Sequence, residues 1–168
     1  IGADKAIRVD ADAQDAFYVA NKLAQIAGGF ELIFEGVEAS DYKGAAVGGM
    51  LAELLGIQSV SAVSGLLVEG NSIKITREIE GGSQTLGVVT PVVPIVQKGS
   101  AKEPRIPAMR GIMMARSKPL EVVNPVATET RVSFVSFDLP PAKANCKKFT
   151  EEQGKELINA LREEAKVL

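Results

Sequence analysis

The chain has 168 residues and a formal net charge of −2, with 46% apolar and 24% charged side chains. This size and composition fit one globular domain, or one domain with an arm, and exclude a disordered chain. Because the chain contains no histidine and one cysteine, Ser-His-Asp catalysis, His-ligated zinc and an internal disulfide are excluded. The nearly balanced charge offers no global attraction to nucleic acid. Without a run of about eighteen apolar residues, no membrane insertion is predicted, and a cytoplasmic location is the default expectation.

The first third of the chain predicts alternating strands and helices. The expected elements are a strand at Ala6–Val9, a helix that Asp12 caps and Gly28 ends, a strand at residues 30–35 and a helix at residues 45–55. This order is typical of a parallel sheet, because parallel neighbours need helical crossovers.

The middle of the chain predicts an antiparallel excursion from that sheet. Strands are expected at residues 59–68, Ser72–Ile79 and 85–89, because two glycine-containing turns separate them. Residues 92–97 then show the pattern of a buried strand, in which Pro94 indicates an edge or a bulge. A proline-interrupted segment and a short helix follow. The fold class predicted is therefore α/β, a three-layer, mostly parallel, Rossmann-like sheet with an antiparallel excursion.

The end of the chain predicts a helical arm. Pro140 and Pro141 lead into a helix that begins with a capping box formed by Thr150 and Gln153. We therefore expect an α/β nucleotide-binding domain at residues 1–139 and a C-terminal arm and helix at residues 140–168.

The turn after the second predicted strand is the first candidate site. Gly44, Ala45 and Ala46 have no bulk to block a ligand at the start of the next helix, where free N–H groups suit a phosphate. Small residues at a helix start also allow close packing. The pattern alone leaves both interpretations open.

The second candidate is the basic segment at residues 98–118. It holds six basic residues and one acidic residue, a local charge of +5, with three methionines between them. Such a segment either steers an acidic partner or forms a solvated basic face over buried methionines, and composition does not decide between them. Glu78 and Glu80 share one face of a predicted strand, but nothing else supports hydrolysis.

Several blocks of the sequence resemble the electron transfer flavoprotein beta subunit family. EPRIPAMRGIMMARSKPLEVV at residues 103–123 resembles that family's Glu-Pro-Arg-Tyr…Ile-Met-Lys-Ala signature. GADKAIRV, FELIFEG and REIEGG follow the family's order and spacing. The resemblance covers essentially all 168 residues, and implies an adenine-nucleotide alpha-hydrolase-like sheet. Family members have about another third of a chain before this point, so the sequence resembles a fragment without that part.

The resemblance implies a redox carrier and not an enzyme with its own substrate, which agrees with the lack of a catalytic or metal-binding constellation. It implies an alpha subunit that holds most of the FAD, and dehydrogenases that supply electrons for a quinone-reductase-type acceptor. The beta subunit is expected to bind AMP or a second FAD.

Site residues carried over from the family fall in two groups. Residues 36–48 correspond to the nucleotide loop Gly-Lys-Gln-Ala-Ile-Asp-Asp-Asp-x-Asn-Gln-Thr-Gly, with which Gly36, Ala39, Asp41 and Gly48 agree. Val37, Glu38, Tyr42 and Lys43 depart from it, and Ala45-Ala46-Val47 replace Asn-Gln-Thr. The nucleotide-binding residues implied are Gly36, Ala39, Asp41, Gly44, Ala45, Ala46, Val47 and Gly48. The partner-docking residues implied are Met109 as an apolar anchor, Arg105 and Arg110 beside it, and Glu78 as the partner of an arginine on the mobile flavin domain.

Two other functions remain open at this stage. One is a nucleotide-binding regulatory domain of universal-stress-protein type, against which the blocks at residues 77–82 and 103–123 argue. The other is a scaffold subunit with an empty nucleotide site, which Ala45-Ala46-Val47 would suit.

Overall fold

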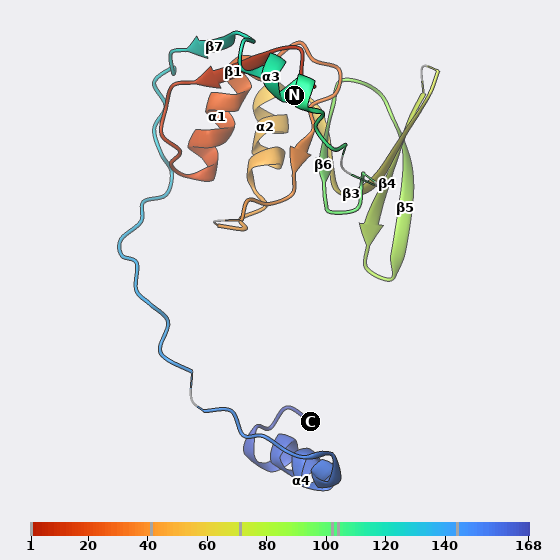
Figure 1. Ribbon diagram of the computed structural model, residues 1–168, viewed down its shortest axis with the longest axis vertical. Coiled ribbons are helices and arrows are strands. Elements are labelled where there is room, and N and C mark those ends of the chain that lie inside the picture. The colour runs from red at the N-terminus through yellow and green to blue at the C-terminus, as the bar shows by residue number, and fades with distance from the viewer. Residues whose placement is uncertain (1, 41, 71, 102, 104, 144) are drawn as a thin grey trace. The chain divides into compact units, whose positions relative to one another are not determined.

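The computed structural model describes residues 2–40, 42–70, 72–101, 103, 105–143 and 145–168. The chain divides into two compact units, residues 1–133 and 134–168. The elements of the first unit are β1 (Ala6–Val9), α1 (Ala16–Ala27), β2 (Glu35–Gly36), α2 (Val47–Leu55), β3 (Gln58–Glu69), β4 (Ser72–Ile79), β5 (Gly82–Val88), β6 (Val92–Val96), α3 (Met109–Ala115) and β7 (Leu120–Val123). This unit is a mixed α/β structure in which α1 and α2 lie side by side (Figure 1).

The strands form two sheets. The larger sheet has the order β2-β6-β3-β4-β5, and β1 pairs with β7 in a separate parallel pair. In the larger sheet β2 and β3 both run parallel to β6, whereas β4 runs antiparallel to β3 and β5. The antiparallel excursion is therefore confirmed. The larger sheet is, however, evenly mixed and not mostly parallel, and the sequence pattern gave no sign that residues 120–123 would pair with β1.

The core is built around β6. Val93 and Ile95 pack against Ala52 of α2. Val92 packs on the other side in a second cluster, with Val60, Val63, Ile73 and Ile75 of β3 and β4. Because both faces are covered, β6 carries the continuous apolar run that is typical of a central parallel strand.

Pro94 is fully buried within β6, which lies between β2 and β3. The expectation that its strand is at an edge is therefore wrong, but the expectation of a bulge is confirmed. The register between β3 and β6 shifts between Val60 and Val63, beside the proline. The irregularity suits a residue that has no N–H to give to the ladder.

The cap of helix α1 lies three residues after the predicted one. The cap is Asp15 and not Asp12, because the Asp15 side chain accepts a hydrogen bond from the Tyr18 backbone N–H at 2.7 Å. The other oxygen of Asp15 accepts from the backbone N–H groups of Arg131 and Val132. The Tyr18 bond, the bonds from Val132 and Arg131, and the Arg131 charge hold the Asp15 pKa below its ordinary value, although burial opposes this.

A second buried polar side chain on α1 contacts the same part of the chain. Lys22 is 6% exposed, and its Nζ donates to the Val126 carbonyl and, at 2.9 Å, to the Thr128 hydroxyl. The ammonium also lies 4.4 Å from the centre of the Tyr18 ring. We call residues 126–132 the strap, because Asp15 and Lys22 together fasten this segment to α1.

The predicted strand at residues 30–35 and the predicted helix at residues 45–55 are both shorter in the structure. Residues 31–37 run beside β6, but only Glu35 and Gly36 form a regular ladder. Helix α2 begins at Val47, because Ala45 has a φ of 49°, in the left-handed region that interrupts a helix. Gly56 ends it in the left-handed conformation with a φ of 66°, as expected.

The second unit holds a short helical segment. It comprises η1 (Glu151–Gln153), α4 (Gly154–Asn159) and η2 (Ala160–Glu164). The predicted capping box is confirmed, since Thr150 and Gln153 exchange both hydrogen bonds. Within the described residues, no helix combines the length and the apolarity that crossing a membrane requires.

Candidate functional site

The predicted nucleotide loop connects the carboxyl end of β2 to the first turn of α2. Because β2, β6 and β3 are mutually parallel, their carboxyl ends lie at one edge of the sheet, where ligands of α/β folds collect. The backbone N–H of Val37 donates to the Val96 carbonyl at 2.8 Å, which joins the start of the loop to the end of β6. The loop therefore has the expected position in the fold.

The individual loop residues offer little to a ligand beyond their backbone. Gly36, Ala39, Gly44 and Ala45 are exposed, whereas Ala46 and Val47 are half-buried. Ala46 precedes α2 without a side-chain cap. Residues 44–48 contain no hydroxyl, amide or cationic side chain. Asp41 lies outside the described residues.

Gly48 has a packing role at this point. A Cβ atom on Gly48 would lie 2.7 Å from Glu35 Oε2 and 2.8 Å from Ile95 Cγ1, so any side chain there would push α2 away from the sheet. The close-packing interpretation of the small residues therefore has a direct basis at Gly48. No equivalent obstruction surrounds Gly36 or Gly44.

Glu35 is a residue that the sequence analysis did not single out. Its Oε2 is buried, and among the described residues it has no hydrogen-bond partner. Burial raises the pKa of this carboxyl group above its ordinary value. The alternating pattern of residues 30–35 gives no sign of this, because burial of Glu35 depends on the close approach of α2 at Gly48.

These residues do not fit a bound phosphate. The nucleotide loop implied by the resemblance has Asn-Gln-Thr side chains where this chain has Ala45-Ala46-Val47. The acidic Glu35 lies against the first turn of α2, where the helix N-terminus would otherwise attract an anion. Three acidic residues and one basic residue occur at residues 35–48. The position of the loop suits a nucleotide, but its charges do not suit a phosphate.

Three of the four predicted docking residues, Arg105, Met109 and Arg110, lie in or just before α3. We call these three together with Ile106 and Met113 the α3 surface. No residue of α3 is buried. Met109 is 72% and Ile106 92% exposed, and Arg105 and Arg110 are exposed as well. The methionines are therefore not buried under a basic face. Large apolar side chains that stay in water beside arginines are typical of an interaction surface.

Glu78 lies on a different element from the α3 surface. It is exposed on β4, in register with Ser83 of β5. Its neighbour Arg77 donates to Gln84 across the same strand pair at 3.0 Å. The structure therefore leaves the Glu78 carboxylate accessible from solvent, close to the turn that joins β4 to β5.

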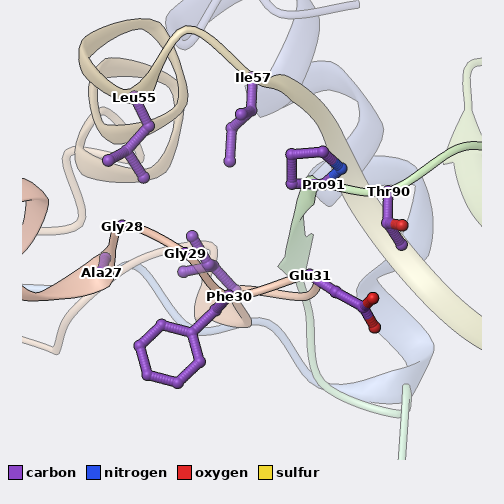
Figure 2. A pocket seen from close by; sticks show the side chains of 10 residues that line it. Ala27, Gly28, Gly29, Phe30, Glu31, Leu55, Ile57, Thr90 and Pro91 are labelled. Atoms are coloured by element: carbon purple, nitrogen blue, oxygen red, sulfur yellow. The ribbon is translucent and has the colours of Figure 1, made fainter.

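A cavity of about 350 Å³ lies at the opposite end of the larger sheet from the loop. Figure 2 shows Leu55 and Ile57, where the chain leaves α2, projecting towards the chain at Gly28 and Gly29. Pro91 and Thr90 line another side, just before β6. None of the predicted site residues lines this cavity. It lies at the amino ends of β3 and β6, away from the edge where the candidate site was expected.

Comparison with known proteins gives a consistent result. The family model described as "Electron transfer flavoprotein domain" matches residues 1–128. An electron transfer flavoprotein subunit beta of Syntrophomonas wolfei is 37% identical, with 90% of this chain and 61% of the relative covered. The proteins with the same description from Bacillus subtilis and Mus musculus are 31% and 32% identical, with 71% and 60% of their lengths covered. The chain thus spans less than two thirds of the Syntrophomonas and mouse relatives.

Proposed function

The chain belongs to the electron transfer flavoprotein beta subunit family, and on that premise we propose that it is an electron-carrier subunit without a substrate of its own. In this proposal an alpha-type subunit holds most of the FAD. Dehydrogenases reduce that flavin, and a quinone-reductase-type acceptor oxidises it. The chemistry belongs to the cofactor, while this chain supplies docking and orientation.

The observation that carries the proposal is the exposure of Met109 between Arg105 and Arg110. Electron carriers need complexes that form fast and dissociate fast. Arginines speed the encounter with an acidic partner, and one apolar anchor adds contact without a large, slowly released interface. The exposed Glu78 would, in the same proposal, pair with an arginine of the mobile flavin domain.

The second unit supports an alpha-type partner. Val135 is 96% and Leu139 94% exposed, and Phe137 is mostly exposed although it stacks on Phe134 at 5.3 Å between ring centres. Apolar side chains that are this exposed indicate a surface that another protein covers. We propose that residues 140–168, together with the preceding exposed residues, dock on the alpha-type subunit.

Met109→Ala tests the proposed anchor. We expect electron transfer from a donor dehydrogenase to slow by about tenfold, because truncating an interface anchor removes more than about 1 kcal/mol of binding. The measurement is stopped-flow flavin reduction in the assembled complex, with bound FAD quantified by absorbance. Met50→Ala on α2 is the matched control and should leave the rate unchanged. Release of FAD from Met109→Ala with unchanged partner kinetics would contradict the anchor role.

The nucleotide in this chain is a separate question. AMP or a second FAD is the family expectation, whereas the charges around Glu35 favour the alternative of a subunit without a phosphate-bound nucleotide. Co-purification of the two subunits tests both points. A yellow flavin spectrum supports the carrier proposal, whereas a colourless complex supports a universal-stress-type or scaffold role. Mass spectrometry of the released nucleotides then distinguishes AMP, FAD and none.

A further inference from the structure

The Glu35 side chain is half-buried, and one of its carboxylate oxygens, Oε2, is a buried polar atom that the proposed electron transfer does not use. Glu35 is the first of the two residues of β2, and its Oε2 lies close to the backbone of Gly48, in the first turn of α2. A Cβ atom on Gly48 would lie 2.7 Å from this oxygen and 2.8 Å from Ile95 Cγ1, so the oxygen and the Ile95 side chain both lie close to Gly48. Among the described residues, no donor satisfies Oε2.

A purely structural role explains this arrangement poorly. A buried carboxylate that stabilises a fold is normally paired or hydrogen-bonded, because an unpaired one costs stability. A leucine or glutamine at position 35 would fill similar space without that cost. We therefore look for a role of the Glu35 charge other than stability. The feature next to it is the predicted nucleotide loop between β2 and α2.

The first turn of α2 is where a phosphate would bind through backbone N–H groups. A carboxylate next to Gly48 adds negative charge at this point, and this charge repels a second anion. Residues 44–48 supply no side-chain donor, and the one cation of the loop, Lys43, is an exposed residue just before them.

We propose that Glu35 is a specificity-determining residue that excludes phosphate-bearing nucleotides from the loop between β2 and α2. The inference rests on the assignment of this loop as the family's nucleotide loop, and not on electron transfer by the complex. Ligands without a phosphate, such as adenosine, are not subject to this exclusion.

The test is titration of AMP into the full chain, alone and in complex with its alpha-type subunit, by calorimetry. Glu35→Gln keeps the size of the side chain and removes the charge, and we expect it to bind AMP about tenfold more tightly than the natural chain. Glu35→Leu is a second variant that removes the same charge and should act in the same direction. Glu38→Gln is the matched control, because it removes an exposed charge from the same loop and should change AMP binding little.

Adenosine titrated into the same proteins separates charge from shape. Its affinity should not differ between the natural chain and Glu35→Gln. The inference is overturned if the natural chain binds AMP as tightly as Glu35→Gln, if neither folded variant gains AMP binding, or if adenosine gains as much as AMP. Flavin content and the rate of flavin reduction, measured on the same complexes, report on the proposed function independently.

Discussion

Two regions of the first unit bury charged side chains, and they do so in opposite ways. Asp15, the cap of α1, and Lys22 on α1 are each 6% exposed, and both form hydrogen bonds with the strap. At the end of β2, the Oε2 atom of Glu35 is buried with no partner among the described residues. Both regions lie in the first unit, so the presence or absence of hydrogen-bond partners depends on the immediate surroundings of each side chain.

The paired charges of α1 stabilise the fold, whereas the unpaired carboxylate oxygen of Glu35 lies beside the candidate site. Paired buried charges hold two distant segments together, because each leaves a buried group unsatisfied if its partner is removed. An unpaired buried carboxylate contributes no such link and reduces stability when it is ionised. Substitutions should therefore have opposite signs in the two regions.

The largest effect is expected for Asp15→Ala. The change removes the cap of α1 and leaves the N–H groups of Arg131 and Val132 without their acceptor. Thermal unfolding should show the largest decrease in Tm among these variants. The Tm of Asp15→Asn should lie between those of the natural chain and Asp15→Ala, because asparagine keeps one acceptor oxygen. Asp12→Ala, at the exposed residue three positions earlier, is the control and should leave Tm nearly unchanged.

The pH dependence of the Asp15 contribution follows from the direction of its shift. The folded pKa lies below the ordinary value of 3.8. The stabilisation is therefore complete above that value and is lost as the pH falls through the lower folded pKa. A Tm difference between the natural chain and Asp15→Ala that grew on acidification would contradict the pairing described for this region.

A smaller loss is expected for Lys22→Met. Methionine removes the ammonium from over the Tyr18 ring and leaves the Thr128 hydroxyl without its donor, so that the Val126 carbonyl accepts from the Thr128 hydroxyl alone. The expected cost is about 1–3 kcal/mol in the free energy of unfolding, measured by urea denaturation. Hydrogen exchange should also become faster in the strap. Lys5→Met is the control, because its exposed ion pair with Glu121 is worth less than about 1 kcal/mol. If both variants lost the same free energy of unfolding, the bonds of Lys22 to the strap would stabilise the fold no more than an exposed ion pair does.

Much of this fold could be predicted from local patterns. The end of α1 at Gly28, the whole of β4 and the capping box at Thr150 all follow from residues within one turn or strand of each other. Such features depend on helix caps and on the period of apolar residues, which a sequence displays directly.

What could not be predicted depends on residues far apart in the chain. Asp12 and Asp15 both satisfy the pattern of a cap, and the choice depends on a contact with Arg131, 116 residues away. Lys22 resembles an ordinary surface residue until the strap covers it. Glu35 resembles the polar end of a strand, and only the missing side chain of Gly48 allows α2 to cover it. The proposed docking residues come from the resemblance, because composition alone did not distinguish buried from exposed methionines at residues 98–118.

The smallest effect, and the only gain, is expected for Glu35→Gln. Burial raises the folded pKa of Glu35 above its ordinary value of 4.5, so the ionised form opposes folding. Below that pH both chains are neutral at this position and should be equally stable. As the pH rises through the higher folded pKa, the natural chain should lose stability relative to Glu35→Gln, and the difference should level off above it. The plateau should be on the order of 1 kcal/mol or less, because the exposed part of the side chain lets water screen the charge. Urea denaturation from pH 4 to pH 8 measures this difference, with Glu38→Gln as the control. If Glu35→Gln were instead less stable throughout, Glu35 would have a partner in solution, and the two regions would bury charge in the same way.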